Sequence, residues 1–264
     1  MSAVITIRTA GVDFHAQVRG SHPRAVFLHG LGGDLHTWDG LWNAIGERLP
    51  AIRYDLRGFG RSICRQQSPF RHADDLLSLL DASAIERCDL IGVSMGASVA
   101  LNFTLDHPER VRSLILISPG LVAWEWSQMW RQLWQPIQDH ARRGELDEAR
   151  RLWWQHPLFS TTRNGDAGPA LFESIMRSSA EEWLDDHHEL MFPDVERLHL
   201  LQTRTLLLTG DRDLDDFRLI ADLIEGSAGN LQRLDQPGRG HLLHLEDPEG
   251  CARRISSFLE APPE

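Results

Sequence analysis

The sequence LIGVSMGASVAL, residues 90–101, contains the joint on which the fold prediction depends. Its first four residues form an apolar run that is typical of a buried strand, and the residues from Met95 onward have the pattern of a helix. Gly92 and Gly96 flank Ser94, and a very tight strand-to-helix turn requires glycine at such positions. We therefore expect a strand, a sharp turn and a helix, with the Ser94 hydroxyl exposed at the carboxyl end of the strand.

The rest of the chain repeats this alternation of strand and helix. Short apolar runs, each followed by a glycine-bearing turn, occupy residues 25–30, 51–56, 88–93, 111–118 and 202–210. Residues 3–8 and 12–19 alternate as an antiparallel hairpin with its turn at Ala10-Gly11. With a last strand from residue 231, the pattern predicts an α/β fold, a mostly parallel eight-stranded sheet with helices on both faces.

The alternation stops between residues 121 and 198. This helical segment holds seven of the nine tryptophans: Trp124, Trp126, Trp130, Trp134, Trp153, Trp154 and Trp183. The second, third and fourth of these recur every four residues, so they share one helix face. We predict a helical cap at 121–198, inserted into an α/β core of residues 1–120 and 199–264. The rings either form the wall of a pocket or pack as an ordinary helical core.

The composition restricts the classes of partner. The chain has 264 residues, a net charge of −11 and three cysteines, which show no metal-type spacing. An acidic surface repels nucleic acid and anionic lipid, and neither a membrane span nor a signal-peptide pattern is present. Sparse cysteines are typical of the cytoplasm. We expect a cytoplasmic protein with a small-molecule substrate and no nucleic-acid or membrane partner; the aromatic cap surface also allows a homodimer contact.

A serine becomes a nucleophile when a base takes its proton, and the base needs an acid to orient it. Among the 13 histidines, His241 is the best placed, because it follows the last strand in a glycine-rich loop. His244, one turn further on, is the alternative. A zinc site at this HxxH pair lacks a third ligand, so we predict no metal and no cofactor.

The strand at 202–210 is followed by candidates for the acid. Asp213 clears the glycine turn and is the better candidate, and Asp211 is the runner-up. Asp215 and Asp216 fall at a predicted helix start, where a carboxylate commonly caps the helix. The other common position for the acid follows the strand at 111–118, and residues 118–120 offer no carboxylate there.

Acyl transfer creates an oxyanion that backbone N–H groups stabilise. The stretch HGLGG, residues 29–33, follows a predicted strand and is rich enough in glycine to fold back toward Ser94. We expect the N–H groups of Leu31 and Met95 to be the two donors. His29 is expected to hold the loop rather than to react.

Taken together, these residues resemble those of the α/β-hydrolase superfamily over nearly the whole chain. The motifs HGLGG, YDLRGFGRS, GVSMGAS, GDRD and GRGHLLHLEDP occur in the family's order, and so do the serine, the aspartate and the histidine. The resemblance implies the α/β-hydrolase fold and independently favours Asp213 and His241. Haloalkane dehalogenases and epoxide hydrolases share the scaffold but use an aspartate nucleophile, so Ser94 argues against both.

Several groups within the superfamily look similar in detail. Enol-lactonases and small carboxylesterases resemble the chain around GVSMG and HPERVRSLIL, and carbon–carbon bond hydrolases of ring-cleavage pathways share a comparable SMG turn. The menaquinone-pathway lyase that makes 2-succinyl-6-hydroxy-2,4-cyclohexadiene-1-carboxylate, SHCHC synthase, is similar around WWQHPLF, residues 153–159. The lyase carries an arginine four residues after its serine, and this chain has Ser98 there.

The predicted substrate pocket follows from these resemblances. The paired cap aromatics of the lyase correspond to Trp153 and Trp154, and one of its substrate-binding arginines corresponds to Arg177. We add Gly30 from the loop and Trp130 from the cap. Arg177 is expected either to meet a substrate carboxylate or to be solvated at the surface.

The expected function is a cofactor-independent serine hydrolase that cleaves an ester or lactone of a small, partly apolar carboxylic acid through an acyl-enzyme. A lyase of the SHCHC-synthase type, or a carbon–carbon bond hydrolase with the same triad, is the alternative. A non-catalytic ligand receptor built on this fold is the second alternative.

Overall fold

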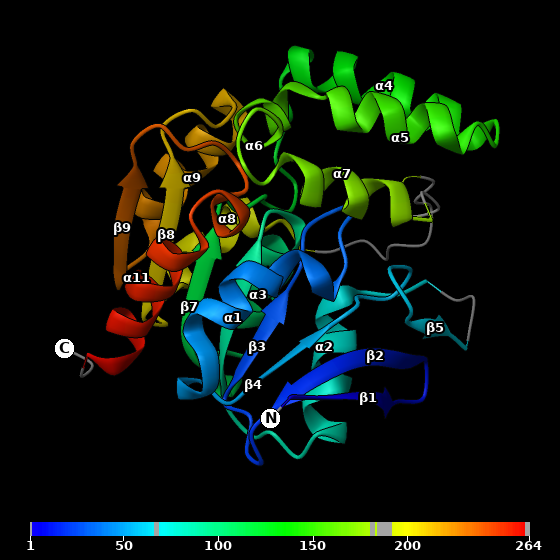
Figure 1. Ribbon diagram of the computed structural model, residues 1–264. Helices are drawn as coiled ribbons and strands as arrows, with labels where there is room; N and C mark the ends of the chain where they lie inside the picture. Colours follow the sequence, from blue (N-terminus) through cyan, green and yellow to red (C-terminus); the bar gives the residue numbers. More distant parts are fainter. Residues whose placement is uncertain (1, 66–68, 180–182, 184–191, 262–264) are drawn as a thin grey trace.

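A computed structural model describes residues 2–65, 69–179, 183 and 192–261 (Figure 1). Its sheet has the strand order β1-β2-β4-β3-β6-β7-β8-β9, and this eight-stranded path confirms the predicted fold class. The strands are β1 (Ser2–Arg8), β2 (Val12–Arg19), β3 (Ala25–Leu28), β4 (Ala51–Tyr54), β6 (Cys88–Val93), β7 (Val111–Ile117), β8 (Thr205–Gly210) and β9 (Leu231–Gln236). A two-residue strand that we did not predict, β5 (Ile63–Cys64), pairs with β2 beside this path.

Pairing within the sheet places the strand ends that matter along one edge. Strands β1 and β2 form an antiparallel hairpin, and β2 is also antiparallel to β4. From β4 to β9 every neighbouring pair is parallel. The loops after β3, β6, β8 and β9, which carry the predicted site residues, therefore start from the same edge of the sheet.

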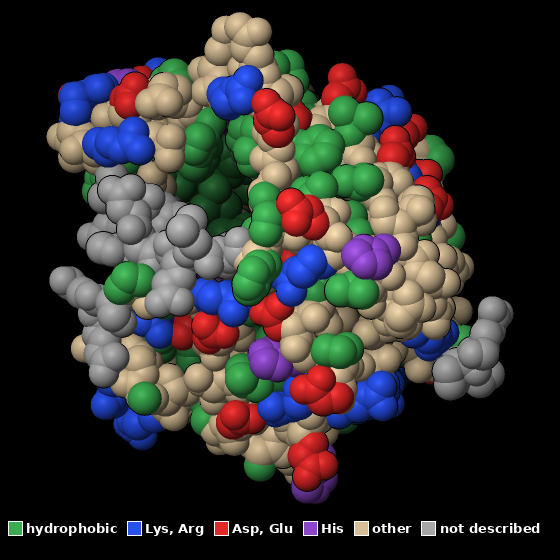
Figure 2. Space-filling view, turned by 180° about the vertical axis from the view of Figure 1, so that it is seen from behind, with side chains coloured by type: hydrophobic (Ala, Val, Ile, Leu, Met, Phe, Trp, Pro, Cys, Tyr) green, Lys and Arg blue, Asp and Glu red, His purple; other side chains and the backbone are tan. Residues whose placement is uncertain are grey.

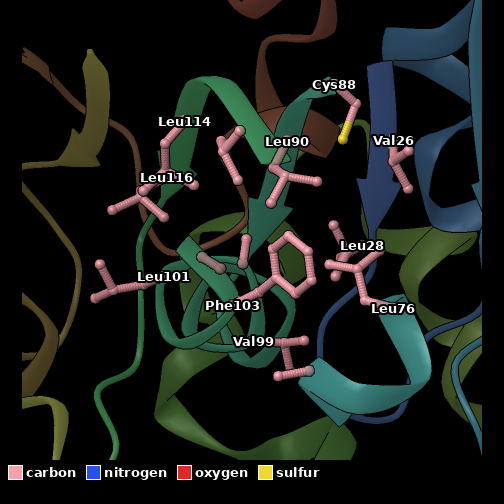
Figure 3. Close-up of a cluster of buried hydrophobic side chains, with 14 of the residues drawn as sticks. Val26, Leu28, Leu76, Cys88, Leu90, Val99, Leu101, Phe103, Leu114 and Leu116 are labelled. Carbon is pink, nitrogen blue, oxygen red and sulfur yellow. The ribbon is translucent and has the colours of Figure 1, made fainter. Parts of the chain in front are cut away.

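Side chains of the central strands alternate between two apolar layers, which is why these strands have almost no polar residues. On one face, Leu90 and Leu116 pack with α2 (His72–Ala82) and α3 (Met95–Asp106), as Figure 3 shows. On the other face, Ile91 and Ile117 pack with α1 (Asp39–Ile45) and α11 (Pro248–Glu260). The sheet is thus covered by helices on both faces, as predicted.

Of the remaining helices, α4 to α8 lie between β7 and β8, α9 lies between β8 and β9, and α10 follows β9. They are α4 (Gln128–Arg142), α5 (Leu146–Gln155), α6 (Ser160–Arg163), α7 (Gly168–Arg177), α8 (Asp194–Arg197), α9 (Asp215–Ser227) and α10 (Leu243–Glu246). Short 3₁₀ helices are η1 (Leu35–Trp38), η2 (Gly46–Arg48), η3 (Pro108–Arg110), η4 (Pro157–Phe159) and η6 (Leu198–Leu200). No described helix combines the length and the apolar character that a bilayer span requires.

Helices α4 to α7 lie beyond the carboxyl ends of the strands, with α4 and α5 side by side (Figure 1). They fall inside the segment predicted as a cap. Helix α8, near the end of that segment, lies instead against the core helix α3, where the Asn102 amide donates to Asp194 at 2.9 Å. The exact division into core and cap at residues 120 and 199 stays a prediction.

Asp216 attaches the start of the helical insertion to the core. Its carboxylate accepts from the Ser127 hydroxyl at 2.6 Å and amide at 3.0 Å, and from Trp124 Nε1 at 3.1 Å. The expected capping role is wrong for this residue, because helix α9 begins without a side-chain capping bond. The carboxylate of Asp216 instead accepts hydrogen bonds from Trp124 and Ser127, at the start of the helical insertion.

Gly96 lets α3 begin directly against the end of β3. A Cβ atom at residue 96 would lie 2.1 Å from the carbonyl oxygen of Leu28 and 2.5 Å from that of His29. These are backbone atoms of a buried strand end, so they cannot move aside cheaply. Gly226 in α9 is the opposite case, because nothing lies within 4 Å of its Cβ position.

We expect the Gly96→Ala and Gly226→Ala substitutions to change stability in opposite directions. Gly96→Ala should lower the free energy of unfolding by about 3 kcal/mol or more, since the methyl group overlaps backbone atoms. Gly226→Ala should raise it by about 0.5–1 kcal/mol, because alanine restricts the unfolded chain and suits a helix. Urea unfolding measures both values, and equal effects would contradict the packing argument.

Candidate active site

Ser94 occupies a strained turn between β6 and α3. Its φ of 52° and ψ of −117° are unusual for a residue other than glycine. The Ser94 amide donates to the Ile117 carbonyl at 2.9 Å, and its carbonyl accepts from the amides of Ser98 at 3.0 Å and Gly120 at 3.2 Å. A Cβ at Gly92 would lie 2.4 Å from the Gly96 carbonyl oxygen. The backbone therefore fixes this turn on both sides, as a nucleophile elbow requires.

His241 and Asp213 form a buried pair at the same edge of the sheet. His241 Nδ1 lies 2.9 Å from one carboxylate oxygen of Asp213 and 3.1 Å from the other, and both side chains are almost fully buried. The Leu214 amide also donates to this carboxylate, at 2.8 Å. A carboxylate at Nδ1 holds the proton there, so that Nε2 is the basic nitrogen of the neutral ring. Among the described residues, His241 Nε2 has no hydrogen-bond partner.

Asp211 and His244, the alternatives for the acid and the base, take no part in the contact between Asp213 and His241. Asp211 is exposed, and its carboxylate accepts from the Gly238 amide at 2.7 Å. His244 is buried against Trp38, with 4.7 Å between the ring centroids. Burial, followed by the charge that His241 carries when protonated, lowers the pKa of His244 to about 3. The contacts single out Asp213 and His241, and the catalytic roles of these residues stay a prediction.

A second close approach brings the His241 loop to the end of β8. A Cβ at Gly210 would lie 2.3 Å from the carbonyl oxygens of both Arg239 and Gly240. The Gly240 amide donates to the Glu246 carboxylate at 2.7 Å, and the Thr162 hydroxyl donates to the same carboxylate at 2.5 Å. The loop that carries His241 is thereby tied to helix α6 of the insertion.

His29 holds the loop that follows β3. Its Nε2 accepts from the Leu56 amide at 3.0 Å, and its Nδ1 lies 2.9 Å from the Gly30 carbonyl oxygen. These are the contacts of a loop-holding side chain, as expected from the sequence. The Cβ position of Gly30 is 3.4 Å from Ser94 Cβ, so the loop lies directly beside the serine.

The two predicted oxyanion donors lie on elements that meet at Ser94. Leu31 follows Gly30 in the loop, and Met95 begins α3. Within the part of the chain that the structure describes, neither backbone amide has a hydrogen-bond acceptor. Their role as oxyanion donors stays a prediction.

Aromatic side chains of the insertion cover this site. Trp130 stacks on Trp126 at 4.5 Å and meets Phe217 at 5.5 Å, and Phe217 lies 4.2 Å from the His241 ring, measured between centroids. Trp153 covers the loop after β3, because its Nε1 lies 2.8 Å from the Cβ position of Gly32. Trp130 is thus linked to His241 through Phe217, and Trp153 lies against the loop that runs beside Ser94.

Trp154 and Arg177 lie away from these rings. Trp154 packs on Phe172, with 5.2 Å between the ring centroids. Arg177 is half exposed and forms an ion pair of 3.3 Å with Asp34. This pair lies in a cleft of about 900 Å³ between the loop after β3, α7 and α10. The pocket roles predicted for Trp154 and Arg177 are not supported by a contact with Ser94 or His241 among the described residues.

His156 is a buried residue beside the candidate site that was not predicted from the sequence. Its ring lies between those of Trp130 and Trp153, with centroid distances of 5.1 and 5.3 Å. Burial is the main reason that its pKa falls to about 4, and the charges of His241 and Arg163 lower it further. One histidine among 13 in the chain carries no sequence signal that would reveal this environment.

The surface of the molecule is hollowed near helices α4 and α5 (Figure 2). Figure 2 shows a deep hollow with mainly hydrophobic walls below the α4–α5 layer, seen from the back of the molecule. Apolar walls with few polar groups are typical of small-molecule sites. Across the described chain, no group of three or more His, Cys, Asp or Glu side chains is arranged to hold a metal ion.

Comparison with known proteins agrees with this geometry. A family profile described as alpha/beta hydrolase fold matches residues 23–143. The carboxylesterase CesB of Bacillus subtilis superposes with a TM-score of 0.83 at 21% identity, covering 100% of this chain and 93% of that one. The chain has the α/β-hydrolase fold, and residues 23–143 match the profile of that family. Both findings agree with the resemblance noted in the sequence.

Two further proteins broaden the comparison, one by structure and one by sequence. The enol-lactonase of Burkholderia xenovorans LB400 has a TM-score of 0.81 at 18% identity, covering 96% of this chain and 98% of that one. The 2-hydroxy-6-oxo-6-phenylhexa-2,4-dienoate hydrolase of Comamonas testosteroni is 34% identical over 113 residues, or 40% of each chain. The chain spans less than half the length of the curated relatives it matches.

The Asp213–His241 contact predicts how a serine-directed reagent will react. We expect Asp213→Asn to slow labelling of Ser94 by a fluorophosphonate by about 10³- to 10⁴-fold, because the amide no longer favours the proton at Nδ1. Asp211→Asn is the matched control and should change the rate only slightly. The labelling rate, followed by intact-protein mass spectrometry, measures both, and a larger effect at residue 211 would reverse the assignment.

The buried neutral histidines predict loss of stability in acid. An unfolded histidine takes up a proton below its ordinary pKa of 6.5, whereas His156 and His244 stay neutral in the folded state until about pH 4 and 3. The unfolded state therefore binds more protons in that window, and stability falls as the pH falls from 6.5 to about 4. Each histidine contributes a slope of about 1.4 kcal/mol per pH unit.

The variant His244→Leu isolates one of these contributions. Urea unfolding at pH 7 and pH 5 should give a smaller pH-dependent loss for this variant than for the wild type. An unchanged loss would mean that His244 is protonated in the folded protein.

Proposed function

We propose that the protein is a cofactor-independent serine hydrolase that cleaves an ester or lactone of a small, partly apolar carboxylic acid through an acyl-enzyme. The observation that carries the proposal is the buried His241–Asp213 pair, with a contact of 2.9 Å at Nδ1 and an unpartnered Nε2. This pair lies at the sheet edge where Ser94 occupies its strained turn. A hydroxyl, an oriented base and an acid are the three groups that nucleophilic acyl transfer needs.

The first half-reaction uses these groups in sequence. Ser94 Oγ attacks the carbonyl carbon while His241 Nε2 takes the hydroxyl proton. The tetrahedral oxyanion accepts hydrogen bonds from the amides of Leu31 and Met95. Collapse breaks the bond to the leaving oxygen, and His241 returns the proton to that oxygen. Asp213 stabilises the imidazolium that exists between the two proton transfers.

Water completes turnover. His241 Nε2 takes a proton from a water molecule as its oxygen attacks the acyl carbon, and the same proton then goes to Ser94 Oγ as the acyl–serine bond breaks. A free carboxylic acid and the original hydroxyl result. The aromatic cover from Trp130 and Trp153 supports a partly apolar acyl group, because such rings bury apolar surface.

Relatives support the same substrate class. Two of the superposed structures are a carboxylesterase and an enol-lactonase, both of which cover nearly the whole chain. The lyase alternative finds no support in the described side chains, since Ser98 replaces an arginine and Arg177 pairs with Asp34. A polyanionic substrate would lack those cationic partners.

A second candidate is hydrolysis of a carbon–carbon bond. It is favoured by the 34% identity to the 2-hydroxy-6-oxo-6-phenylhexa-2,4-dienoate hydrolase. That reaction needs the same serine and histidine. The decay of the visible absorbance of that dienoate in the presence of the protein tests it directly.

The test of the proposed function is esterase activity that depends on Ser94. We expect p-nitrophenyl acetate and butyrate to be hydrolysed at least about 10³-fold faster by the wild type than by Ser94→Ala, since the substitution removes the nucleophile. A fluorophosphonate probe should label the wild type alone. Absence of labelling, together with no turnover above that of the variant, would reject a serine hydrolase and favour a ligand receptor.

A further inference from the structure

His156 stands out because one of its two ring nitrogens, Nε2, is buried near the candidate site without a hydrogen-bond partner among the described residues. The side chain is 2% exposed and lies on the turn between α5 and η4. Among the described residues, its Nε2 atom has no hydrogen-bond partner. A buried N–H without an acceptor costs about 1–3 kcal/mol, so such a group in a native protein needs an explanation.

The protonation state of the ring follows from its hydrogen bond with Leu158 and from its burial. The Leu158 amide donates to His156 Nδ1 at 3.2 Å, so this nitrogen is an acceptor. Burial lowers the pKa of His156 to about 4, which keeps the ring neutral at pH 7. The single ring proton is therefore on Nε2, which makes that atom a hydrogen-bond donor.

The ring of His241 has the opposite arrangement. Its Nδ1 carries the proton toward Asp213, and its Nε2 is the acceptor. His156 Nε2 and His241 Nε2 are both without a partner among the described side chains, so they are not bonded to each other. His156 is connected to the base through adjoining rings, since Trp130 contacts both His156 and Phe217, and Phe217 contacts His241.

Trp153, whose ring adjoins that of His156, supplies a second hydrogen-bond donor. Its Nε1 also lacks a partner in the described part of the chain, and the side chain is 2% exposed. This atom lies 2.8 Å from the Cβ position of Gly32, in the loop that reaches Ser94 through Gly30. The Trp153 and His156 ring centroids are 5.3 Å apart, so the two neutral N–H donors belong to adjoining rings.

We propose that His156 is a specificity-determining residue whose Nε2–H donates to a second, uncharged oxygen of the substrate, with Trp153 Nε1–H as a supporting donor. The inference rests on the proposed hydrolase function and narrows its substrate to esters or lactones that carry an additional keto or ether oxygen in the acyl part.

An uncharged oxygen fits this environment better than a second carboxylate. Arg163, whose charge reaches His156, donates to the carbonyl oxygens of Trp154 at 2.6 Å and His156 at 3.3 Å. Arg177 is held by Asp34 at the cleft. A buried carboxylate without a cationic partner is costly, whereas a keto oxygen needs only a donor such as a neutral N–H.

The experiment compares esters that differ by one oxygen. The probes are p-nitrophenyl 5-oxohexanoate against the hexanoate, and the 4-oxopentanoate against the pentanoate. We expect the wild type to give a kcat/KM ratio of about 10 or more in favour of one oxo ester, because the unpaired donor then finds its acceptor. His156→Leu should reduce that ratio about tenfold, and His156→Gln, which keeps an N–H donor, should restore part of it.

Two controls separate specificity from folding and from intrinsic reactivity. His140→Leu changes a cap histidine that pairs with Glu145 at the surface, and it should leave the ratio unchanged. Comparing variants on the same pair of esters cancels the intrinsic reactivity of each ester. Trp153→Phe should lower the ratio less than His156→Leu does. The inference is wrong if His156→Leu leaves the kcat/KM ratio of oxo ester to plain ester unchanged for both pairs of esters.

Binding to a protein that cannot turn over distinguishes the two proposals. Methyl 5-oxohexanoate and methyl hexanoate are titrated into Ser94→Ala and into Ser94→Ala with His156→Leu, using tryptophan fluorescence. A Kd preference for the oxo ester that His156→Leu removes supports the inference, even where the wild type hydrolyses no ester and the proposed function fails. The inference is wrong if each of the two proteins binds the oxo ester and the plain ester with equal Kd values, whatever the esterase activity of the wild type.

Discussion

The first turn of α3 lies against the end of β3 with no room for a Cβ atom at Gly96, and the rest of the site depends on this contact. The contact sets the direction in which the chain leaves β6, and it holds Ser94 at a φ of 52°. It also brings the HGLGG loop beside the serine, since β3 carries that loop. One steric constraint thus brings the hydroxyl and both predicted oxyanion amides together, and the His29 side chain holds the loop that carries one of them.

Much of this arrangement follows from the sequence because it depends on neighbours in the chain. The strand at 88–93, the glycines around Ser94 and the Asp213 and His241 positions are local patterns, and the parallel sheet brings them to one edge. The two-residue strand β5 was missed, because so short a segment pairs only when β2 is already in place. Its sequence alone has no strand signal.

The directions of the side chains in the helical insertion could not be predicted from the sequence either, because they depend on contacts with other elements. Trp153 and Trp154 are adjacent on a helix, so their side chains diverge by about 100° and only one can cover the serine loop. Which one does so depends on how α5 is turned, and that depends on Phe172 and Gly32 from other elements. Likewise, a partner for Arg177 comes from Asp34, which is remote in sequence.

The tie between Gly240, Glu246 and Thr162 has a consequence for how affinity and rate evolve. The carboxylate of Glu246 holds the His241 loop with one oxygen and helix α6 with the other. The positions of the helical insertion and of His241 are therefore coupled. We expect mutations that reshape the insertion for a new ligand to displace His241, the proposed base, so that selection on binding and selection on turnover act on the same few bonds.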